Sequence, residues 1–240
     1  MTQPIVHFSD VTKSYTGQPV LAGVNLDLGE GEFLGLVGLN GAGKTTMIKC
    51  MLDFISMDSG SISICGRPAA STSARADLAY LPEKFTPPYY LTGRDYLEYM
   101  ARLYATPLDL DRVRDIFRTL DLTEAALSRP VRQLSKGMSQ KLGLAACLLS
   151  GKRLLILDEP MSGLDPRARA YLKQYLLELK ARREVSIFFS THLLHDVEAL
   201  CDRVAILHQG RIRFAGTPSE CCGQFAAGDF EQAYLACIGD

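Results

Sequence analysis

The first 65 residues show the hydrophobic spacing of short strands. Between residues 20 and 28 apolar and polar side chains alternate, with Val24, Leu26 and Leu28 on one face, which predicts a half-buried strand. The apolar run at residues 33–37 suits a strand that is buried on both faces. The other elements predicted in this part are two strands, at residues 5–8 and 61–65, and one helix, at residues 43–52.

From residue 92 onward the spacing becomes helical and then alternates. Apolar residues recur at helical intervals in two segments, at Leu97, Met100, Ala101 and Tyr104, and at Val113, Ile116, Phe117 and Leu120. Three further strands then alternate with two helices, the strands at residues 154–157, 185–189 and 204–207 and the helices at 167–182 and 194–201. Because such alternation is typical of strands joined by crossover helices, it predicts an α/β fold with a mainly parallel sheet.

No linker rich in Pro, Gly or Ser divides the chain, so we expect one domain over residues 1–240. Its helical part forms an insertion at about residues 83–150. The tail, about residues 217–240, is weakly patterned and is expected to form a short helix pair.

Composition excludes several classes of protein. The 240 residues are 47% hydrophobic and 22% charged, which excludes collagen-like and disordered chains. The 26 basic and 27 acidic residues give a net charge of -1. The overall charge of the chain therefore does not favour binding to nucleic acid. Seven cysteines without metal-ligand spacing indicate neither a zinc site nor a disulfide framework, and Cys221 and Cys222 stay unassigned. With no signal sequence and no apolar run of about 18 residues, we expect a cytoplasmic chain.

Residues Gly38 to Thr45 match the spacing of a phosphate-binding loop between a strand and a helix. Glycines let backbone N–H groups turn inward around a phosphate, and the helix N-terminus adds partial positive charge. Lys44 would reach the β- and γ-phosphates, and the Thr45 hydroxyl would bind Mg²⁺. The alternative is a glycine-rich turn with a surface lysine, which average residue frequencies produce in about 1% of chains this long. The loop therefore predicts nucleotide binding.

Two carboxylates, Asp158 and Glu159, follow the predicted strand at 154–157. Strand ends in a parallel sheet deliver residues to a ligand crevice, where Asp158 would hold Mg²⁺ through water and Glu159 would orient or deprotonate the attacking water. Adjacent strand residues point to opposite faces, so the pair must lie where the backbone turns, before Pro160. The alternative is a simple turn after a core strand.

A second anion-binding helix end is predicted at Leu134–Met138, which opens a helix predicted at 139–149. Two such ends in one chain are peculiar for a kinase or a GTPase. With the phosphate loop and the acidic pair, they resemble the ATP-binding cassette (ABC) family over residues 5–216. The resemblance implies a P-loop NTPase core with an N-terminal antiparallel β-subdomain and an α-helical insertion. It also implies a head-to-tail dimer, in which Ser135 and Gly137 complete the partner subunit's ATP site.

The remaining site residues are implied by the resemblance alone. Tyr15 resembles the aromatic residue that stacks on adenine, although a tyrosine there would by itself more often be a packing or surface residue. The loop Ser162–Asp165 resembles the one that crosses the dimer seam, and Asp165 also suits a helix cap. His192 resembles the switch histidine at the γ-phosphate. The implied cofactors are ATP and Mg²⁺, and the implied nucleotide-binding set is Tyr15, Asn40, Gly41, Ala42, Gly43, Lys44, Thr45, Thr46, Ser135 and Gly137. The implied seam residues are Ser162, Gly163, Leu164 and Asp165.

Three positions depart from the family pattern. Glu83 stands where the family usually has Gln, and a carboxylate can face Mg²⁺ or water but cannot donate a hydrogen bond as an amide does. Lys136 and Met138 stand where Gly and Gln are commonest. Similar variants are familiar among cassettes of the exporter type, so Glu83 remains a candidate catalytic and metal-facing residue.

Three functions are compatible with this family: the ATPase subunit of a transporter, a non-transport ATPase acting on nucleic acid or ribosomes, and a pseudoenzyme. The second class usually carries coiled coils, zinc modules or fused cassettes, and the sequence has none of these patterns. A pseudoenzyme is disfavoured because Lys44, Asp158, Glu159 and His192 are all present. We therefore expect a transporter ATPase without a nucleic-acid partner.

The implied partners are a separate transmembrane permease and a second copy of the chain or a related ABC ATPase, at the cytoplasmic face of the membrane. Aromatic residues crowd after Glu83, at Phe85, Tyr89 and Tyr90, as anchors of an interface do. The alternative is a local turn that packs on its own helices. Neither the transported substrate nor its direction follows from these features.

Overall fold

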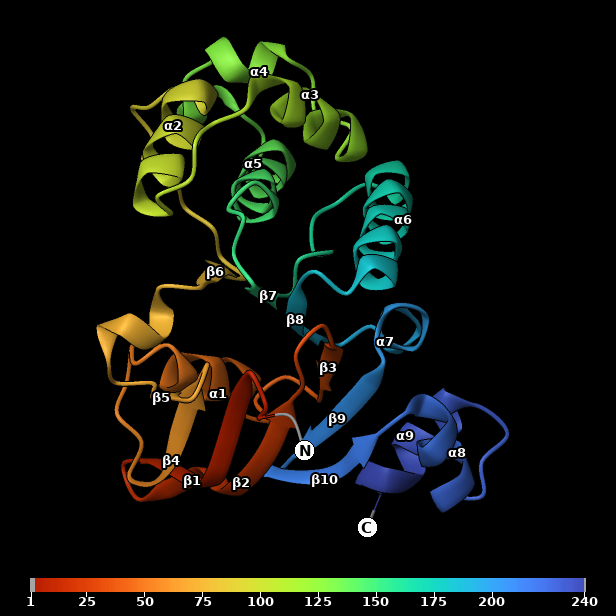
Figure 1. Cartoon of the computed structure of the whole chain (residues 1–240). Coiled ribbons are helices and arrows are strands. Elements are labelled where there is room, and N and C mark those ends of the chain that lie inside the picture. The colour runs from red at the N-terminus through yellow and green to blue at the C-terminus, as the bar shows by residue number, and fades with distance from the viewer. Residues whose placement is uncertain (1–2, 240) are drawn as a thin grey trace. The chain divides into compact units, whose positions relative to one another are not determined.

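The computed structural model describes residues 3–239, which form two compact units. Unit 1 is built from the chain up to Asp77 and from Arg183 onward, and unit 2 is Leu78–Arg182 (Figure 1). The insertion predicted at 83–150 lies within unit 2. That the whole chain acts as one domain stays a prediction.

An antiparallel sheet of unit 1 has the strand order β2-β1-β4-β5. The strands are β1 (Val6–Tyr15), β2 (Gln18–Leu28), β4 (Ser59–Ile64) and β5 (Arg67–Pro68). The alternation predicted for β2 is confirmed, since Val24, Leu26 and Leu28 are buried. β1 runs on to Tyr15, well past its predicted end, because Asp10 takes a left-handed conformation (φ 47°) and a bulge there lets pairing with β2 continue.

Four more strands of unit 1 lie in the order β10-β9-β3-β8. They are β3 (Phe33–Val37), β8 (Ser186–Thr191), β9 (Arg203–His208) and β10 (Arg211–Gly216). β3 pairs in parallel with β8 and β9, β10 pairs antiparallel to β9, and all five residues of β3 are buried, as predicted. Helix α7 (Leu194–Leu200) packs closely on β3, because a Cβ at Gly35 would lie 2.4 Å from Cγ1 of Val197.

The other helices of unit 1 flank these strands. α1 (Lys44–Met51) follows β3 and contacts β2 and β4. The tail forms the expected helix pair, α8 (Pro218–Gln224) and α9 (Phe230–Ile238), which pack on each other and on β10. A capping box of Thr217 and Glu220 begins α8. A 3₁₀ turn covers Thr72–Arg75.

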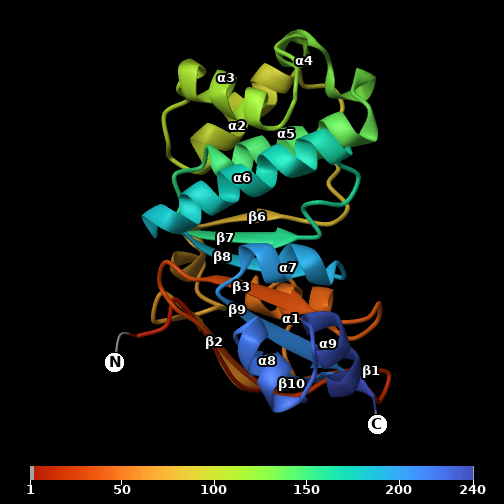
Figure 2. The same cartoon turned by 90° about the vertical axis from the view of Figure 1, so that its right-hand side faces the viewer.

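Unit 2 joins a pair of parallel strands to a set of helices. Its strands are β6 (Leu78–Leu81) and β7 (Leu154–Asp158). Its helices are α2 (Gly93–Leu103), α3 (Leu110–Thr119), α4 (Ala125–Ser128), α5 (Lys136–Leu148) and α6 (Pro166–Arg182), with a 3₁₀ turn at Val131–Gln133. In Figure 2, α5 and α6 lie next to β6 and β7, and α3 and α4 lie beyond them. Residues 140–148 of α5 are all buried, which explains why this helix has no polar face in the sequence.

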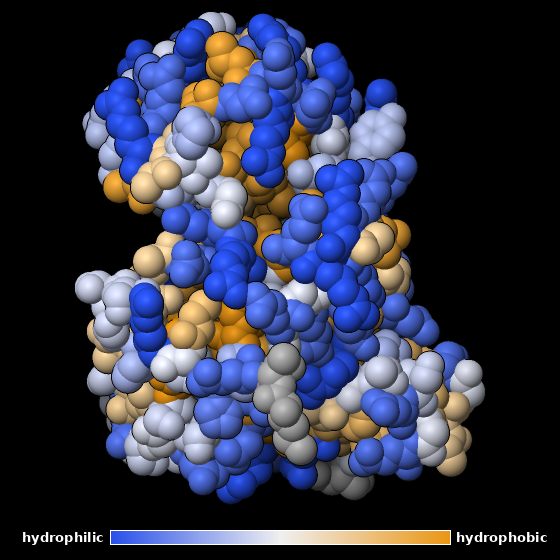
Figure 3. All heavy atoms as spheres, viewed as in Figure 1, coloured by the Kyte–Doolittle hydropathy of each residue, from blue (hydrophilic) through white to orange (hydrophobic). Residues whose placement is uncertain are grey.

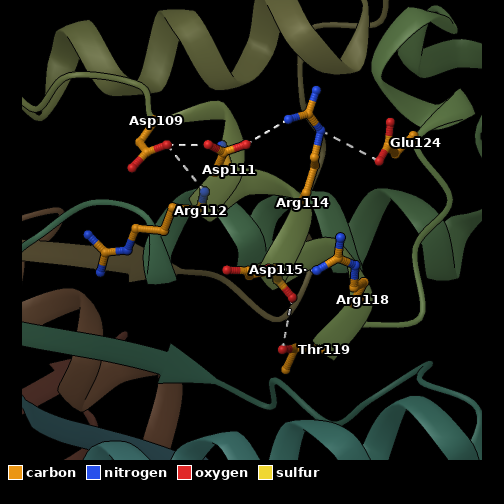
Figure 4. A network of polar contacts seen from close by, with 8 residues as sticks. All are labelled: Asp109, Asp111, Arg112, Arg114, Asp115, Arg118, Thr119 and Glu124. Atoms are coloured by element: carbon orange, nitrogen blue, oxygen red, sulfur yellow. Dashed lines mark hydrogen bonds and ion pairs between the residues drawn. The ribbon is translucent and has the colours of Figure 1, made fainter.

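The exposed face of α3 is covered by charged side chains (Figure 4). Asp109 caps the helix by accepting from the backbone N–H groups of Asp111 and Arg112. Arg114 pairs with Asp111 at 2.7 Å, and a second pair of the same spacing lies one turn on. Because exposed ion pairs of this kind contribute at most about 1 kcal/mol each, they indicate a solvated face and not a binding site.

The aromatic stretch after Glu83 divides into a packed and an exposed part. The Phe85 ring lies 5.7 Å from the Tyr96 ring and against Gly143 of α5, where a Cβ would be 2.7 Å from Phe85 Cε1. Tyr89 and Tyr90 are 67% and 70% exposed. The packing alternative therefore holds for Phe85, and the two tyrosines remain candidate anchors.

Within residues 3–239, no helix is both long enough and apolar enough to span a bilayer. On the face drawn in Figure 3, hydrophilic residues cover most of the surface of each unit.

Candidate active site

The loop between β3 and α1 has a backbone that only glycine permits. Gly41 and Gly43 have positive φ angles of 84° and 112°, and a Cβ at Gly38 would lie 2.4 Å from the carbonyl oxygen of Leu207. Gly43 is the N-cap of α1 and provides no capping side chain. The first-turn N–H groups of α1 are therefore the donors that a helix offers to an anion.

The Lys44 side chain lies back across this loop. Its Nζ donates to the carbonyl oxygens of Gly38 at 2.7 Å and Leu39 at 3.3 Å, and the residue is only 8% exposed. A phosphate entering the loop would meet a largely desolvated ammonium, whose attraction is stronger than that of a surface lysine. Thr45 and Thr46 follow in the first turn of α1.

Tyr15 lies at the turn end of the β1–β2 hairpin, where it pairs with Gln18, and is 45% exposed. Lys13 lies over its ring, with Nζ 5.6 Å from the centroid. Asp58 fixes this arrangement, because it accepts from Lys13 Nζ at 2.9 Å and from the N–H of Ser14 at 2.6 Å. The same pair raises the pKa of Lys13 and, with the Ser14 N–H, lowers the pKa of Asp58. One ring face of Tyr15 is thus backed by a cation, an arrangement that sequence reasoning missed.

His192 follows the end of β8 in unit 1. In the parallel register Val37 of β3 pairs with Thr191 of β8, so Gly38 and His192 leave the same edge of the sheet. His192 is exposed, and the adjacent N–H of Leu193 donates to the Thr191 hydroxyl at 3.1 Å. The structure thus brings the predicted phosphate loop and the predicted switch histidine to one edge.

The predicted acidic pair ends β7 in unit 2. Asp158 is the last strand residue, and Glu159 has a left-handed backbone with φ 50°, which confirms the expected turn. Both are buried, at 2% and 8% exposure. Leu81 of β6 pairs with Leu157 of β7, so Glu83 leaves the same strand edge as the pair.

The pKa of Tyr80 agrees with the placement of Glu83 and Asp158 at one strand edge. Burial raises the pKa of Tyr80, and the carboxylates of Asp158 and Glu83 raise it further. Across residues 3–239 no three His, Cys, Asp or Glu side chains gather as a metal cage. The carboxylates at this strand edge are nevertheless suitable donors for Mg²⁺, because that ion usually takes its other ligands from substrate phosphates and water.

The second predicted anion end is the start of α5. Ser135 is the N-cap and its Oγ accepts from the N–H of Met138 at 3.2 Å, so the helix begins at Lys136 and not at 139 as predicted. The polar and glycine residues of this turn hid its helical character from the sequence. Gly137 lies close to the 162–165 loop, since a Cβ there would be 3.0 Å from the carbonyl oxygen of Gly163.

The loop Ser162–Asp165 is folded by two turns. Ser162 N–H donates to the carbonyl of Glu159 at 3.0 Å, and Leu164 N–H donates to that of Met161 at 3.3 Å. Asp165 caps α6 as predicted, accepting from the N–H of Ala168 at 2.9 Å. Ser162, Gly163 and Asp165 are exposed, whereas Leu164 is buried.

Sequence reasoning missed Lys141, a buried lysine of α5. Its Nζ donates to Oδ2 of Asp165 at 2.8 Å. This hydrogen bond is the main cause that lowers the pKa of Asp165 to about 2. The only sequence signal was a lysine beside the apolar run 142–149.

The predicted site residues therefore fall into two sets, one in each unit. Unit 1 holds Tyr15, the loop from Gly38 to Thr46, and His192. Unit 2 holds the acidic residues, the α5 start and the 162–165 loop, that is Glu83, Asp158, Glu159, Ser135, Gly137, Ser162, Gly163, Leu164 and Asp165.

A glycine-lined loop between a buried parallel strand and a helix, on an α/β fold with an acidic strand end, defines a P-loop nucleotide-binding protein. The family model described as ABC transporter matches residues 21–162. The chain belongs to the ABC transporter family.

Two curated relatives support this assignment. An uncharacterized ABC transporter ATP-binding protein of Nostoc sp. is 40% identical over 92% of this chain and 69% of its own length. Nod factor export ATP-binding protein I of Burkholderia orbicola is 35% identical over 89% of this chain and 71% of its own length.

Solved structures agree. The ATP-binding subunit of an ABC transporter has 34% identity and a TM-score of 0.88, covering 97% of this chain and 99% of that one. A dimeric ATP-binding cassette in a post-hydrolysis state with ADP and phosphate has a TM-score of 0.79 over 88% of this chain and 98% of that one; at 22% identity it supports the fold alone. The chain is thus an ATP-binding subunit and ATPase of the ABC transporter family, which confirms the expected fold class and function.

Proposed function

We propose that this chain hydrolyses ATP to drive transport through a separate transmembrane permease, as half of a head-to-tail dimer at the cytoplasmic face of the membrane. The observation that carries the proposal is the buried Lys44 ammonium, held over a glycine-lined loop in a member of the ABC transporter family. The export named for the Burkholderia relative favours export for this chain too.

ATP binding is assigned to unit 1. The β- and γ-phosphates would replace the carbonyls of Gly38 and Leu39 as partners of Lys44, while the backbone of residues 40–46 surrounds them. The adenine would stack on the face of Tyr15 opposite Lys13.

Hydrolysis is assigned to Glu159 as general base. Water attacks the γ-phosphorus, its proton passes to the Glu159 carboxylate, and the bond to the ADP oxygen breaks. His192 and Glu83 would position the γ-phosphate and that water, since both follow strand ends that carry the other site residues. Mg²⁺, when bound through Thr45, Asp158 and Glu83, would neutralise phosphate charge.

The dimer is supported by the charge of the two units. The sequence of unit 2 has 17 Lys and Arg against 12 Asp and Glu, a net charge of +5, which leaves -6 for unit 1 of a chain whose net charge is -1. A head-to-tail dimer places unit 1 of one chain opposite unit 2 of the other. A second copy of the same chain is therefore electrostatically complementary. Ser135, Gly137 and the loop 162–165 are the residues proposed to meet the partner's nucleotide.

The decisive experiment uses Glu159→Gln, which keeps the shape of the side chain but removes the base. We expect a monomer without ATP and a stable dimer with ATP, measured by light scattering, with weaker association as salt is raised. The matched control is Lys44→Ala combined with Glu159→Gln, which should stay monomeric. A Glu159→Gln protein that binds ATP and remains a monomer contradicts the dimer. Recovery of ribosomes or nucleic acid, and no polytopic membrane protein, with the tagged chain would favour the non-transport alternative.

A further inference from the structure

We propose that Lys141 is a positioning residue that locks the start of α5 (Ser135–Met138, the signature turn) to the segment Glu159–Asp165, the seam segment. It thereby ties the base of one ATP site to the groups that act on the partner's ATP. This inference rests on the proposed function of both sites.

Lys141 is a charged residue where packing alone would favour an apolar one. It is 6% exposed and lies in the fully buried part of α5. Its Nζ donates to Oδ2 of Asp165 at 2.8 Å and to the carbonyl oxygen of Asp121, just beyond α3, at 3.2 Å. Burial of an ammonium costs free energy unless the group is paired, and these two contacts provide the pairing. A methionine of similar length could make neither contact.

Asp165 uses its two carboxylate oxygens for different tasks. Oδ1 accepts from the N–H of Ala168 and so begins α6, while Oδ2 accepts from Lys141. The low pKa of Asp165 keeps the carboxylate charged at neutral pH. Through its ion pair and its hydrogen bond, Lys141 therefore joins the start of α6 to α5 and to Asp121, just beyond α3.

The seam segment is held at a second point by the same helix face. Gly137 and Lys141 are four residues apart on α5, so they lie on one side of the helix. Gly137 meets the carbonyl of Gly163, and Lys141 meets Asp165. The turns that begin at the Glu159 and Met161 carbonyls connect these points to the base. The signature turn and the base are thus fixed to each other within one chain.

The test compares Lys141→Met, which removes the charge but keeps the length, with Lys141→Arg, which keeps the charge. ATP affinity of the monomers, followed with a fluorescent ATP analogue, should stay within about twofold of wild type, because the phosphate loop lies in unit 1. In the Glu159→Gln background, Lys141→Met should weaken the ATP-driven dimer at least about tenfold. With Glu159 present, it should lower kcat more than it changes KM. Lys141→Arg should keep most of the dimer stability and most of the kcat of the form with Lys141.

Asp165→Asn provides a second route, because the amide oxygen can still cap α6 while the ion pair is lost. Like Lys141→Met, it should weaken the ATP-driven dimer, and it provides this test even if Lys141→Met fails to fold. If both variants dimerise with ATP as strongly as Glu159→Gln alone, the inference is overturned and the proposed function stays intact. Equal impairment by Lys141→Met and Lys141→Arg would also overturn it. If Glu159→Gln alone stays monomeric with ATP bound, the proposed function fails first.

Discussion

The exposed tyrosines beside the packed Phe85 provide the sharpest test of coupling to a membrane partner. Replacing Tyr89 and Tyr90 together with alanine removes two large side chains from unit 2. The neighbouring Phe85 ring, which packs on Tyr96 and Gly143, is untouched, so the unit should keep its fold.

The expected magnitude follows from the area these rings can bury. They are 67% and 70% exposed, with centroids 5.6 Å apart in an edge-on pair. A tyrosine side chain offers about 150–250 Å², so roughly 100–175 Å² of each is open to a partner. If docking covers about half of that area at about 25 cal/mol per Å², the pair contributes about 2.5–4 kcal/mol. The dissociation constant for docking should rise about 50- to 1,000-fold.

The assay titrates permease-containing membranes with the labelled chain and measures ATP affinity in parallel. Phe54→Ala is the matched control, because Phe54 is 62% exposed but belongs to unit 1. We expect the control to bind membranes like wild type, and every form to keep its ATP affinity. Equal membrane binding by the double alanine variant and wild type would refute this surface as the docking site.

Other changes test the site itself. Lys44→Ala should abolish ATP binding or slow hydrolysis at least about 100-fold, because the phosphates lose a desolvated charge; phosphate release near the wild-type rate would rule out the phosphate-loop assignment. Glu83→Gln should retain substantial ATPase activity, since acid and amide can both order a water, whereas Glu83→Ala should be slower and less well coupled to transport. An alanine variant that equals wild type in both assays would make Glu83 structural. The pKa of Asp165, about 2, lies below its unfolded value of about 3.9. The stability that the charged carboxylate contributes is therefore complete above about pH 5 and is lost as pH falls toward 2. Asp165→Asn should therefore lower Tm at pH 7, with a difference from wild type that shrinks on acidification; a difference independent of pH would contradict the ion pair.

Hydrophobic spacing predicted the elements whose burial is uniform along their length. β3 begins and ends at the predicted residues, because a fully buried strand has no polar face to blur its limits. β10 was missed, since only Phe214 and Gly216 are buried in a strand of alternating basic and apolar residues. α5 was predicted to start three residues late, because its first turn is stabilised by the Ser135 cap and not by apolar packing.

In the site, the sequence likewise predicted local contacts but missed contacts between residues that are far apart in the chain. Motif spacing identified Asp165 as a helix cap, since capping is local and depends on the next three residues. It could not find the second partner of Asp165, because Lys141 is 24 residues away and meets it only through tertiary packing. Lys13 and Asp58 were missed for the same reason, since 45 residues separate them.

The division of the chain into two units has a chemical consequence. The groups proposed to hold ATP, Lys44 and Tyr15, belong to unit 1, whereas the proposed base Glu159 belongs to unit 2. Each set is fixed by contacts within its own unit, Lys44 by the loop carbonyls and the segment after Glu159 by Lys141. Binding and hydrolysis should therefore separate under mutation. Changes in unit 2 should alter hydrolysis and dimerisation at nearly constant ATP affinity. The Lys44→Ala variant should lose ATP binding, hydrolysis and dimerisation together.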